Sequence, residues 1–189
     1  MKLKIPNILT IGRIILVPIL ILTFYLPGFW GDLIPFILFL LASFTDFLDG
    51  LLARLYKEES KLGELLDPIA DKIIVASALV LLVMNKTIVN YEVVAAIIIL
   101  TREILISGLR EFLAKVQVNM PVTNLAKFKT FAQMFAIAIL LTGESGNKIV
   151  NFGDYNAHSI GIILLWLAAF LTIYTGYDYV KKGIDHAVN

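Results

Sequence analysis

Cysteine is absent from the 189 residues, which excludes disulfides and metal sites built on thiolates. Charge is scarce as well, since Asp, Glu, Lys and Arg make up 16% of the chain, against about 25% in typical soluble domains. The net charge is +1 and there is no basic tail, so nothing in the charge pattern indicates nucleic-acid binding. Hydrophobic residues make up 59%, and the mean hydropathy is +0.85. These values predict an all-α integral membrane protein with one domain over residues 1–189.

Six mostly apolar stretches are candidates for membrane-spanning helices, each of which needs about 20 apolar residues. They cover residues 9–26, 33–52, 69–84, 91–109, 128–141 and 160–180. The third and fifth stretches are short, so we expect their helices to extend into the flanking polar turns. The sequence therefore predicts a six-transmembrane-helix bundle. The small and aliphatic residues of the sixth stretch offer a surface for packing or for a homodimer.

Lysine and arginine are distributed unevenly between the two ends of this predicted bundle. The segments 27–32, 85–90 and 142–159 share one side and contain only Lys86 and Lys148. The other fourteen cationic residues lie in or toward the opposite ends. The positive-inside rule then places both termini in the cytoplasm, together with the segment that joins the second and third stretches.

That cytoplasmic segment, "TDFLDGLLARLYKEESKLGELLDPIAD", contains four aspartates. Asp46 and Asp49 are spaced i,i+3, and Asp67 and Asp71 are spaced i,i+4, so each pair projects from one face of a helix. Four carboxylates around one small volume repel one another and must hold protons or cations. Oxygen ligands without His or Cys favour Mg²⁺, Mn²⁺ or Ca²⁺ over zinc. The spacing predicts a divalent-metal site between two helices.

Small residues between the aspartates fit such a site. Gly50 and Gly63 have no side chain, so another helix or a phosphate could approach the backbone closely. Ala53 keeps the Asp46–Asp49 face narrow, and Arg54 could hold a carboxylate or a phosphate in two-point geometry.

The aspartates also fit two roles without a metal. A single aspartate at a helix end is usually a cap or a salt-bridge partner, and Asp67 followed by Pro68 predicts a helix start with Asp67 at the cap. A proton or cation carrier also uses intramembrane carboxylates. Neither role requires Gly50, Ala53 and Gly63 at fixed spacing.

The pattern Asp46-x2-Asp49-Gly50-x2-Ala53-Arg54-x8-Gly63-x3-Asp67-x3-Asp71 resembles the signature of the CDP-alcohol phosphotransferase family at every fixed position. The resemblance implies a six-helix membrane enzyme that transfers a phosphoryl-linked group from a CDP-activated donor to an alcohol and releases CMP. It also implies two divalent cations, Mg²⁺ or Mn²⁺, held by the four aspartates. Asp71 would bridge to the second ion and act as the base. Intramembrane prenyltransferases also use Mg²⁺ and aspartates, but their acidic motifs lie far apart in longer chains.

The acceptor alcohol must be inferred from other residues, and here cations stand out. Arg102 and Arg110 lie in "TREILISGLRE", where Glu103, Ser107 and Arg110 share one face that we expect to point into the bundle. Anchoring at the cytoplasmic surface explains Arg110, but Arg102 lies deeper than anchoring needs. Cations beside a metal–carboxylate centre indicate an anionic acceptor, because neutral serine or inositol would not need them.

Two lysines follow in "LAKFKTFAQM". Lys127 and Lys129 point about 200° apart on an undistorted helix, so we expect only one of them to enter a pocket. The other is expected to extend toward lipid head groups. Which lysine faces the pocket is left open by the sequence.

Three stretches, "IPNILTIGRIILVP", "REILISGLRE" and "KFKTFAQM", resemble bacterial members of this family that use CDP-diacylglycerol and glycerol 3-phosphate. One departure is Ala126, where related enzymes often have glycine. The resemblance implies a multi-pass protein of the bacterial cell membrane with its active site facing the cytoplasm. Inositol phosphate and serine stay as alternative acceptors.

The resemblance also assigns residues to the two substrates. Glycerol 3-phosphate is expected at Arg102, Arg110, Lys127 and Lys129. CDP-diacylglycerol is expected at Asn7, Thr10, Arg13, Asp49, Gly50, Ala53, Arg54 and Gly63. The first three of these residues fit an amphipathic turn at the membrane interface equally well.

Overall fold

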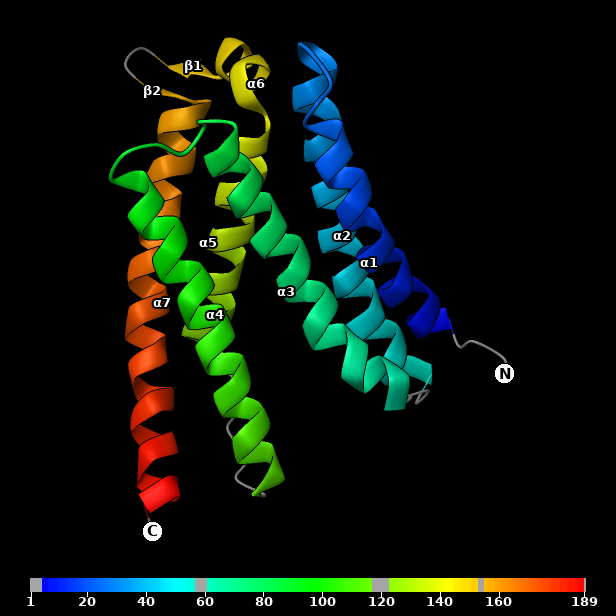
Figure 1. Cartoon of the computed structure of the whole chain (residues 1–189), viewed down its shortest axis with the longest axis vertical. Coiled ribbons are helices and arrows are strands. Elements are labelled where there is room, and N and C mark those ends of the chain that lie inside the picture. The colour runs from blue at the N-terminus through cyan, green and yellow to red at the C-terminus, as the bar shows by residue number, and fades with distance from the viewer. Residues whose placement is uncertain (1–4, 57–60, 117–122, 153–154, 189) are drawn as a thin grey trace.

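A computed structural model describes residues 5–56, 61–116, 123–152 and 155–188 and shows a helical bundle (Figure 1). Its long helices are α1 (Ile5–Thr23), α2 (Phe29–Tyr56), α3 (Lys61–Met84), α4 (Glu92–Lys115), α5 (Asn124–Leu141) and α7 (Ala157–Val188). Each of the six predicted apolar stretches corresponds to one of these helices, so the predicted all-helical architecture is confirmed. Between α5 and α7 the chain adds a short helix, α6 (Gly143–Ile149), and two paired antiparallel strands, β1 (Asn151–Phe152) and β2 (Tyr155–Asn156).

The start of α3 differs from the prediction. The helix begins at Lys61, so Asp67 and Pro68 lie inside it and Asp67 is not its cap. Residues 61–66 are mostly Lys, Leu and Glu, which favour helix, and this propensity carries the helix through the proline. Further along, Lys72 Nζ donates a hydrogen bond to the Pro68 carbonyl over 3.0 Å.

The helices form two groups with α3 between them. In Figure 1, α4, α5 and α7 lie on one side, where α7 packs extensively on both α4 and α5. On the other side α1 packs against α2 and α3, and α3 runs diagonally toward the first group. The start of α1 and the end of α7 lie at the same end of the molecule, whereas α6 and the β1–β2 ladder lie at the opposite end.

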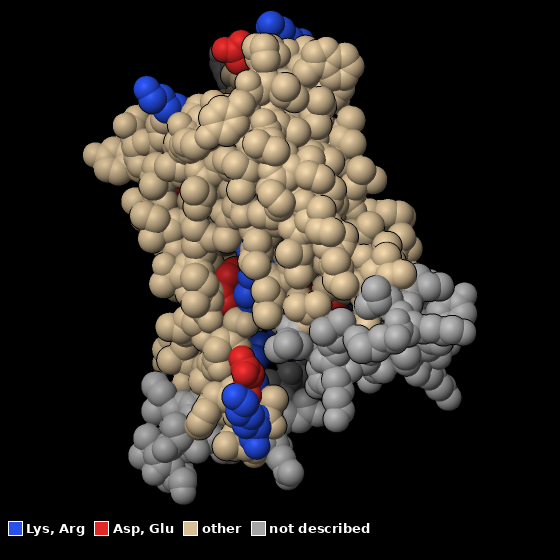
Figure 2. Space-filling view, turned by 45° about the vertical axis from the view of Figure 1, so that its right-hand side comes forward, with Lys and Arg blue, Asp and Glu red and all other residues tan. Residues whose placement is uncertain are grey.

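Much of the molecular surface is apolar. Among the residues that the structure describes, three helical windows are long and apolar enough to cross a membrane: Phe29–Asp46, Asn124–Leu141 and Ala157–Lys181. Asn7–Thr23 is a shorter apolar segment. Large hydrophobic side chains such as Leu22 are exposed, and Figure 2 shows a broad uncharged surface between charged ends. These features fit a membrane protein. Six spans, cytoplasmic termini and a homodimer stay predictions.

The end of the bundle that carries α6 is closed by polar contacts. Asp32 of α2 accepts hydrogen bonds from the backbone N–H and the hydroxyl of Ser145, over 2.9 and 2.7 Å. Gly143 has a φ of +53° here, and a Cβ at that position would lie 2.2 Å from an Asp32 carboxylate oxygen. The His158 ring binds the Thr87 carbonyl over 2.8 Å. His158 therefore has a structural contact at the end remote from the aspartates.

Candidate active site

A large cavity of about 1570 Å³ opens between α2, α3, α4 and α5. Figure 2 shows acidic and basic atoms gathered in a recess below a broad uncharged area of the surface. The charged residues that line the cavity are Asp46, Asp71, Lys72, Arg102, Glu103, Arg110, Glu111, Lys127 and Lys129. Two of the predicted metal-binding aspartates and all four predicted acceptor-binding cations thus share one space. Ser107 lines it too, so the predicted inward face of Glu103, Ser107 and Arg110 is confirmed.

On the α1 side of this cavity, Arg13 joins the carboxylates of two helices. Its side chain is 1% exposed and forms an ion pair with Asp46 of α2. A second guanidinium nitrogen lies 3.7 Å from Oδ1 of Asp67 on α3. The Thr10 hydroxyl donates to the same Asp67 oxygen over 2.5 Å. Because one guanidinium reaches both carboxylates, Asp46 and Asp67 lie close together on facing helices.

These contacts give the N-terminal helix a role that sequence reasoning missed. Thr10 and Arg13 were expected beside the donor, which stays a prediction, and in the structure both contact the aspartates. A buried guanidinium requires compensating negative charge, and half-exposed Asp46 and Asp67 supply it. Asn7, one turn earlier, is also buried. The first helix therefore fixes the position of the carboxylates whether or not it also contacts a donor.

The donor atoms of this region suit a hard divalent ion. Asp46, Asp67 and Asp71 offer only carboxylate oxygens, and no histidine or cysteine lies among the described residues that line the cavity. Within the described ranges no three acidic or histidine side chains are close enough to form a complete metal-binding group. The surroundings of Asp49, Gly50, Ala53 and Arg54 lie outside the described residues, whereas Gly63 is buried in α3. The described residues thus provide part of a fitting ligand set.

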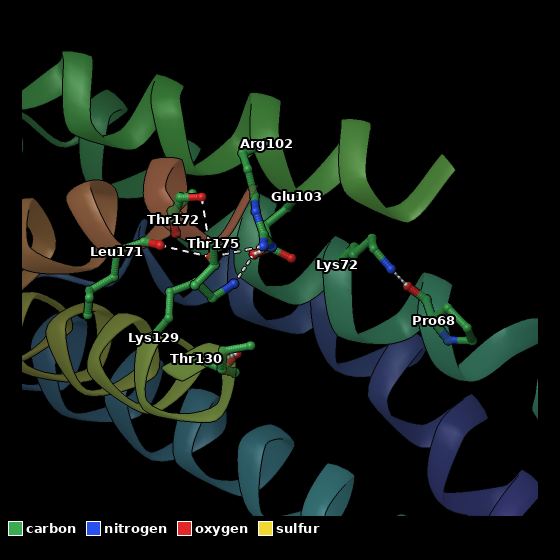
Figure 3. Close-up of polar contacts among 10 residues, drawn as sticks. Pro68, Lys72, Arg102, Glu103, Lys129, Thr130, Leu171, Thr172 and Thr175 are labelled. Atoms are coloured by element: carbon green, nitrogen blue, oxygen red, sulfur yellow. Dashed lines mark hydrogen bonds and ion pairs between the residues drawn. The ribbon is translucent and has the colours of Figure 1, made fainter. Parts of the chain in front are cut away.

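On the opposite wall, Glu103 holds two cations in place (Figure 3). Glu103 of α4 forms an ion pair with Lys129 of α5, and its carboxylate lies 3.4 Å from the guanidinium of Arg102. Arg102 also donates to the Thr175 hydroxyl of α7 over 3.1 Å. The Lys129 side chain is buried and that of Arg102 nearly so. One network therefore joins three helices and fixes two positive charges at the cavity wall.

Two further cations of the cavity are arranged differently. Arg110 and Lys127 have exposed side chains, and neither has an ion-pair partner among the residues that the structure describes. They are free to bind an incoming anion, whereas Lys129 and Arg102 are already engaged by Glu103.

The expectation that only one of the two α5 lysines could line a pocket was wrong. Lys127 and Lys129 both line the cavity. The helix begins at Asn124, so Lys127 lies in its first turn, and the wide cavity extends around this helix end. The prediction assumed a narrow pocket, which two side chains about 200° apart could not both enter. The cavity is wide, so this angle does not exclude either lysine.

Polar residues of α7 and α5 were also missed. Thr172, Thr175 and Tyr179 are buried at positions i, i+3 and i+7 of a helix that was interpreted as apolar packing surface. Tyr179 lines the cavity, and Thr175 holds Arg102. Gln133 of α5 is buried one turn after Lys129. The helical spacing of these polar residues within apolar stretches was the available signal.

Comparison with known proteins gives a consistent result. A family model described as CDP-alcohol phosphatidyltransferase matches residues 3–174. Several similar curated proteins carry the name CDP-diacylglycerol–glycerol-3-phosphate 3-phosphatidyltransferase. The protein from Rickettsia bellii is 47% identical over 94% of both chains. The protein from Cereibacter sphaeroides is 39% identical over 98% of both chains. The protein from Haemophilus influenzae is 40% identical, over 97% of this chain and 96% of the relative.

The Arg13 bridge leads to a stability prediction. Arg13→Ala should lower the free energy of unfolding by about 1–3 kcal/mol, because Asp46 and Asp67 lose their shared cation while staying partly solvated. Thermal unfolding in detergent would measure the loss. Lys115→Ala is the control, since Lys115 forms an exposed pair with Glu111 that should contribute less than about 1 kcal/mol. Equal unfolding temperatures for the two variants would contradict a structural role for the bridge.

Proposed function

The chain belongs to the CDP-alcohol phosphatidyltransferase family, and from this premise we propose that it transfers the phosphatidyl group of CDP-diacylglycerol to glycerol 3-phosphate. The products would be phosphatidylglycerophosphate and CMP. The names of its relatives support this choice of substrates. The observation that carries it is the shared cavity, in which Asp46 and Asp71 face a wall of four cations. A phosphorylated acceptor needs such a wall, whereas a neutral alcohol does not.

The acceptor phosphate is proposed to bind the two exposed cations, Arg110 and Lys127. Arg110 can meet a phosphate with two parallel hydrogen bonds, and Lys127 adds a point charge. Lys129 and Arg102 support this site from the buried wall, where Glu103 keeps both side chains in fixed positions. The charges of Lys129 and Arg102 are therefore already in position when the acceptor phosphate binds.

Asp71 is proposed to act as the base. It lines the cavity on the α3 side, opposite the cations of α4 and α5. In the reaction it would take the proton of the primary hydroxyl of glycerol 3-phosphate. The hydroxyl oxygen then forms a bond to the phosphorus attached to diacylglycerol. The bond from that phosphorus to the oxygen of CMP breaks, and CMP leaves with the electron pair.

We further propose that Asp46, Asp49, Asp67 and Asp71 hold two divalent cations, Mg²⁺ or Mn²⁺. When bound, such ions neutralise the negative charge of a pyrophosphate and of a departing phosphate. The donor is proposed to lie near Asn7, Thr10, Arg13, Asp49, Gly50, Ala53, Arg54 and Gly63. The active site is proposed to face the cytoplasm in a multi-pass protein of the bacterial cell membrane.

Metal removal tests the ligand assignment. Activity of the purified protein should disappear in EDTA and return with Mg²⁺ or Mn²⁺, because clustered carboxylates repel a pyrophosphate unless divalent charge is present. The rate of CMP release from CDP-diacylglycerol would be measured with each ion. Full turnover in metal-free buffer would exclude the proposed ions.

Asp71 is proposed both as the base and as a metal ligand, so its substitution is compared with that of Asp67, which is proposed as a ligand alone. Asp71→Asn should lower kcat by a factor of at least ~10², the usual contribution of a positioned base, while CDP-diacylglycerol still binds. Asp67→Asn is the comparison, since it should weaken activation by the divalent ion as well as turnover. A near-normal rate for Asp71→Asn would assign the proton to another group.

Acceptor choice is tested at Arg110. Arg110→Ala removes a charge-assisted contact of roughly 1.5–3 kcal/mol, so the KM for glycerol 3-phosphate should rise about 10- to 150-fold. The KM for CDP-diacylglycerol should stay nearly unchanged. Lys115→Ala is a matched control on the same helix, because Lys115 is exposed and paired with Glu111.

A panel of acceptors completes this test. Wild-type protein should use glycerol 3-phosphate well, and free glycerol, serine and inositol phosphate poorly. Preference for one of the other alcohols would overturn the proposed acceptor. If Arg110→Ala lost affinity for CDP-diacylglycerol but kept its affinity for glycerol 3-phosphate, Arg110 would be assigned to the binding of CDP-diacylglycerol.

A further inference from the structure

A smaller cavity of about 250 Å³ lies between α3, α4 and α5. Asp71, Glu103 and Lys129 line both this space and the large cavity, so the two adjoin at the proposed base. A cavity needs about 10–15 Å³ of this space to hold one water molecule, so the smaller cavity has room for a three-carbon alcohol. It therefore provides a place for the acceptor's carbon skeleton beside Asp71.

One polar side chain in this smaller cavity has no assigned role. Gln133 of α5 lines it and is 3% exposed. Its buried amide oxygen lacks a hydrogen-bond partner within the described part of the chain. A buried amide oxygen without a partner is unfavourable, so a polar group that reached it would stabilise the site. Gln133 follows Lys129 by four residues, so both project from the same face of α5.

We propose that Gln133 binds the secondary hydroxyl of glycerol 3-phosphate and thereby selects a polyol phosphate as the acceptor. The proposal rests on the proposed function. That acceptor has three polar groups: its primary hydroxyl is assigned to Asp71, and its phosphate to the cations. Only the secondary hydroxyl of the acceptor is then left without a partner. On the protein side, the buried amide oxygen of Gln133 has no hydrogen-bond partner among the described residues. A hydroxyl both donates and accepts, so it can pair with either end of the amide.

The neighbouring carboxylate is a poorer partner for this hydroxyl. Glu103 lines the same cavity but is already bound to Lys129 and lies 3.4 Å from Arg102. Binding a hydroxyl would weaken the contact by which Glu103 fixes both cations. Gln133 carries no charge, so its engagement leaves the cationic wall intact.

The test compares two acceptors that differ only at the second carbon, glycerol 3-phosphate and 3-hydroxypropyl phosphate. Wild-type protein should show a kcat/KM about tenfold or more higher for glycerol 3-phosphate, since the analogue leaves the amide unpaired. Gln133→Met keeps the length of the side chain and removes its polar amide. In this variant kcat/KM for glycerol 3-phosphate should fall about tenfold, with little change for the analogue. The ratio of the two values should approach one.

Met134→Leu is the matched control, because Met134 is the adjacent residue, lines the same cavity and is apolar. It should leave the ratio between the two acceptors unchanged. Equal losses for both acceptors in Gln133→Met would overturn the proposal and assign Gln133 to packing. Equal use of both acceptors by wild-type protein would overturn it without any variant. If wild-type protein used neither phosphorylated acceptor, the proposed function itself would fail.

Discussion

Charge buried in an apolar bundle must be compensated, and this constraint organises both halves of the structure. In one half, Arg13 of α1 is buried and binds carboxylates of α2 and α3. In the other half, Glu103 of α4 binds Lys129 and lies beside Arg102, which reaches α7 through Thr175. Each half therefore has one central group with two partners of opposite charge. Removing a central group leaves two like charges close together, which makes these contacts necessary for the arrangement of the helices.

The cavity follows from the way the two networks are separated. Asp46, Asp71 and Lys72 lie on the α2–α3 wall, whereas four cations and two glutamates lie on the α4–α5 wall, with α3 crossing between the two groups of helices. Five cationic and four acidic described side chains line the space, so its charges nearly balance overall while its two walls differ in sign. Such a field orients a ligand with an anionic end and a hydroxyl end, since the two ends prefer opposite walls.

Local spacing predicted much of this arrangement, and three-dimensional packing decided the rest. The Glu103–Ser107–Arg110 face depends on helix geometry alone, so the sequence was sufficient to predict it. The clustering of all four aspartates around metal ions stays a prediction. The predicted start of α3 was wrong because the helix propensity of residues 61–66 outweighs the proline signal. The exclusion of one α5 lysine was wrong because cavity width depends on neighbouring helices. Thr175 and Gln133 were missed because an isolated polar residue in an apolar stretch shows its role only through its partners.

The difference between buried and exposed cations has a chemical consequence. Lys129 and Arg102 are held by Glu103, so they contribute a fixed field without needing to move when an anion binds. Arg110 and Lys127 are exposed. In the proposed function they form and release direct contacts with each acceptor molecule. A site in which all four cations were unpaired would hold a phosphate more tightly but would also retain the phosphorylated product. Division of the cations into a fixed pair and an exposed pair therefore suits an enzyme whose acceptor and product carry the same phosphate.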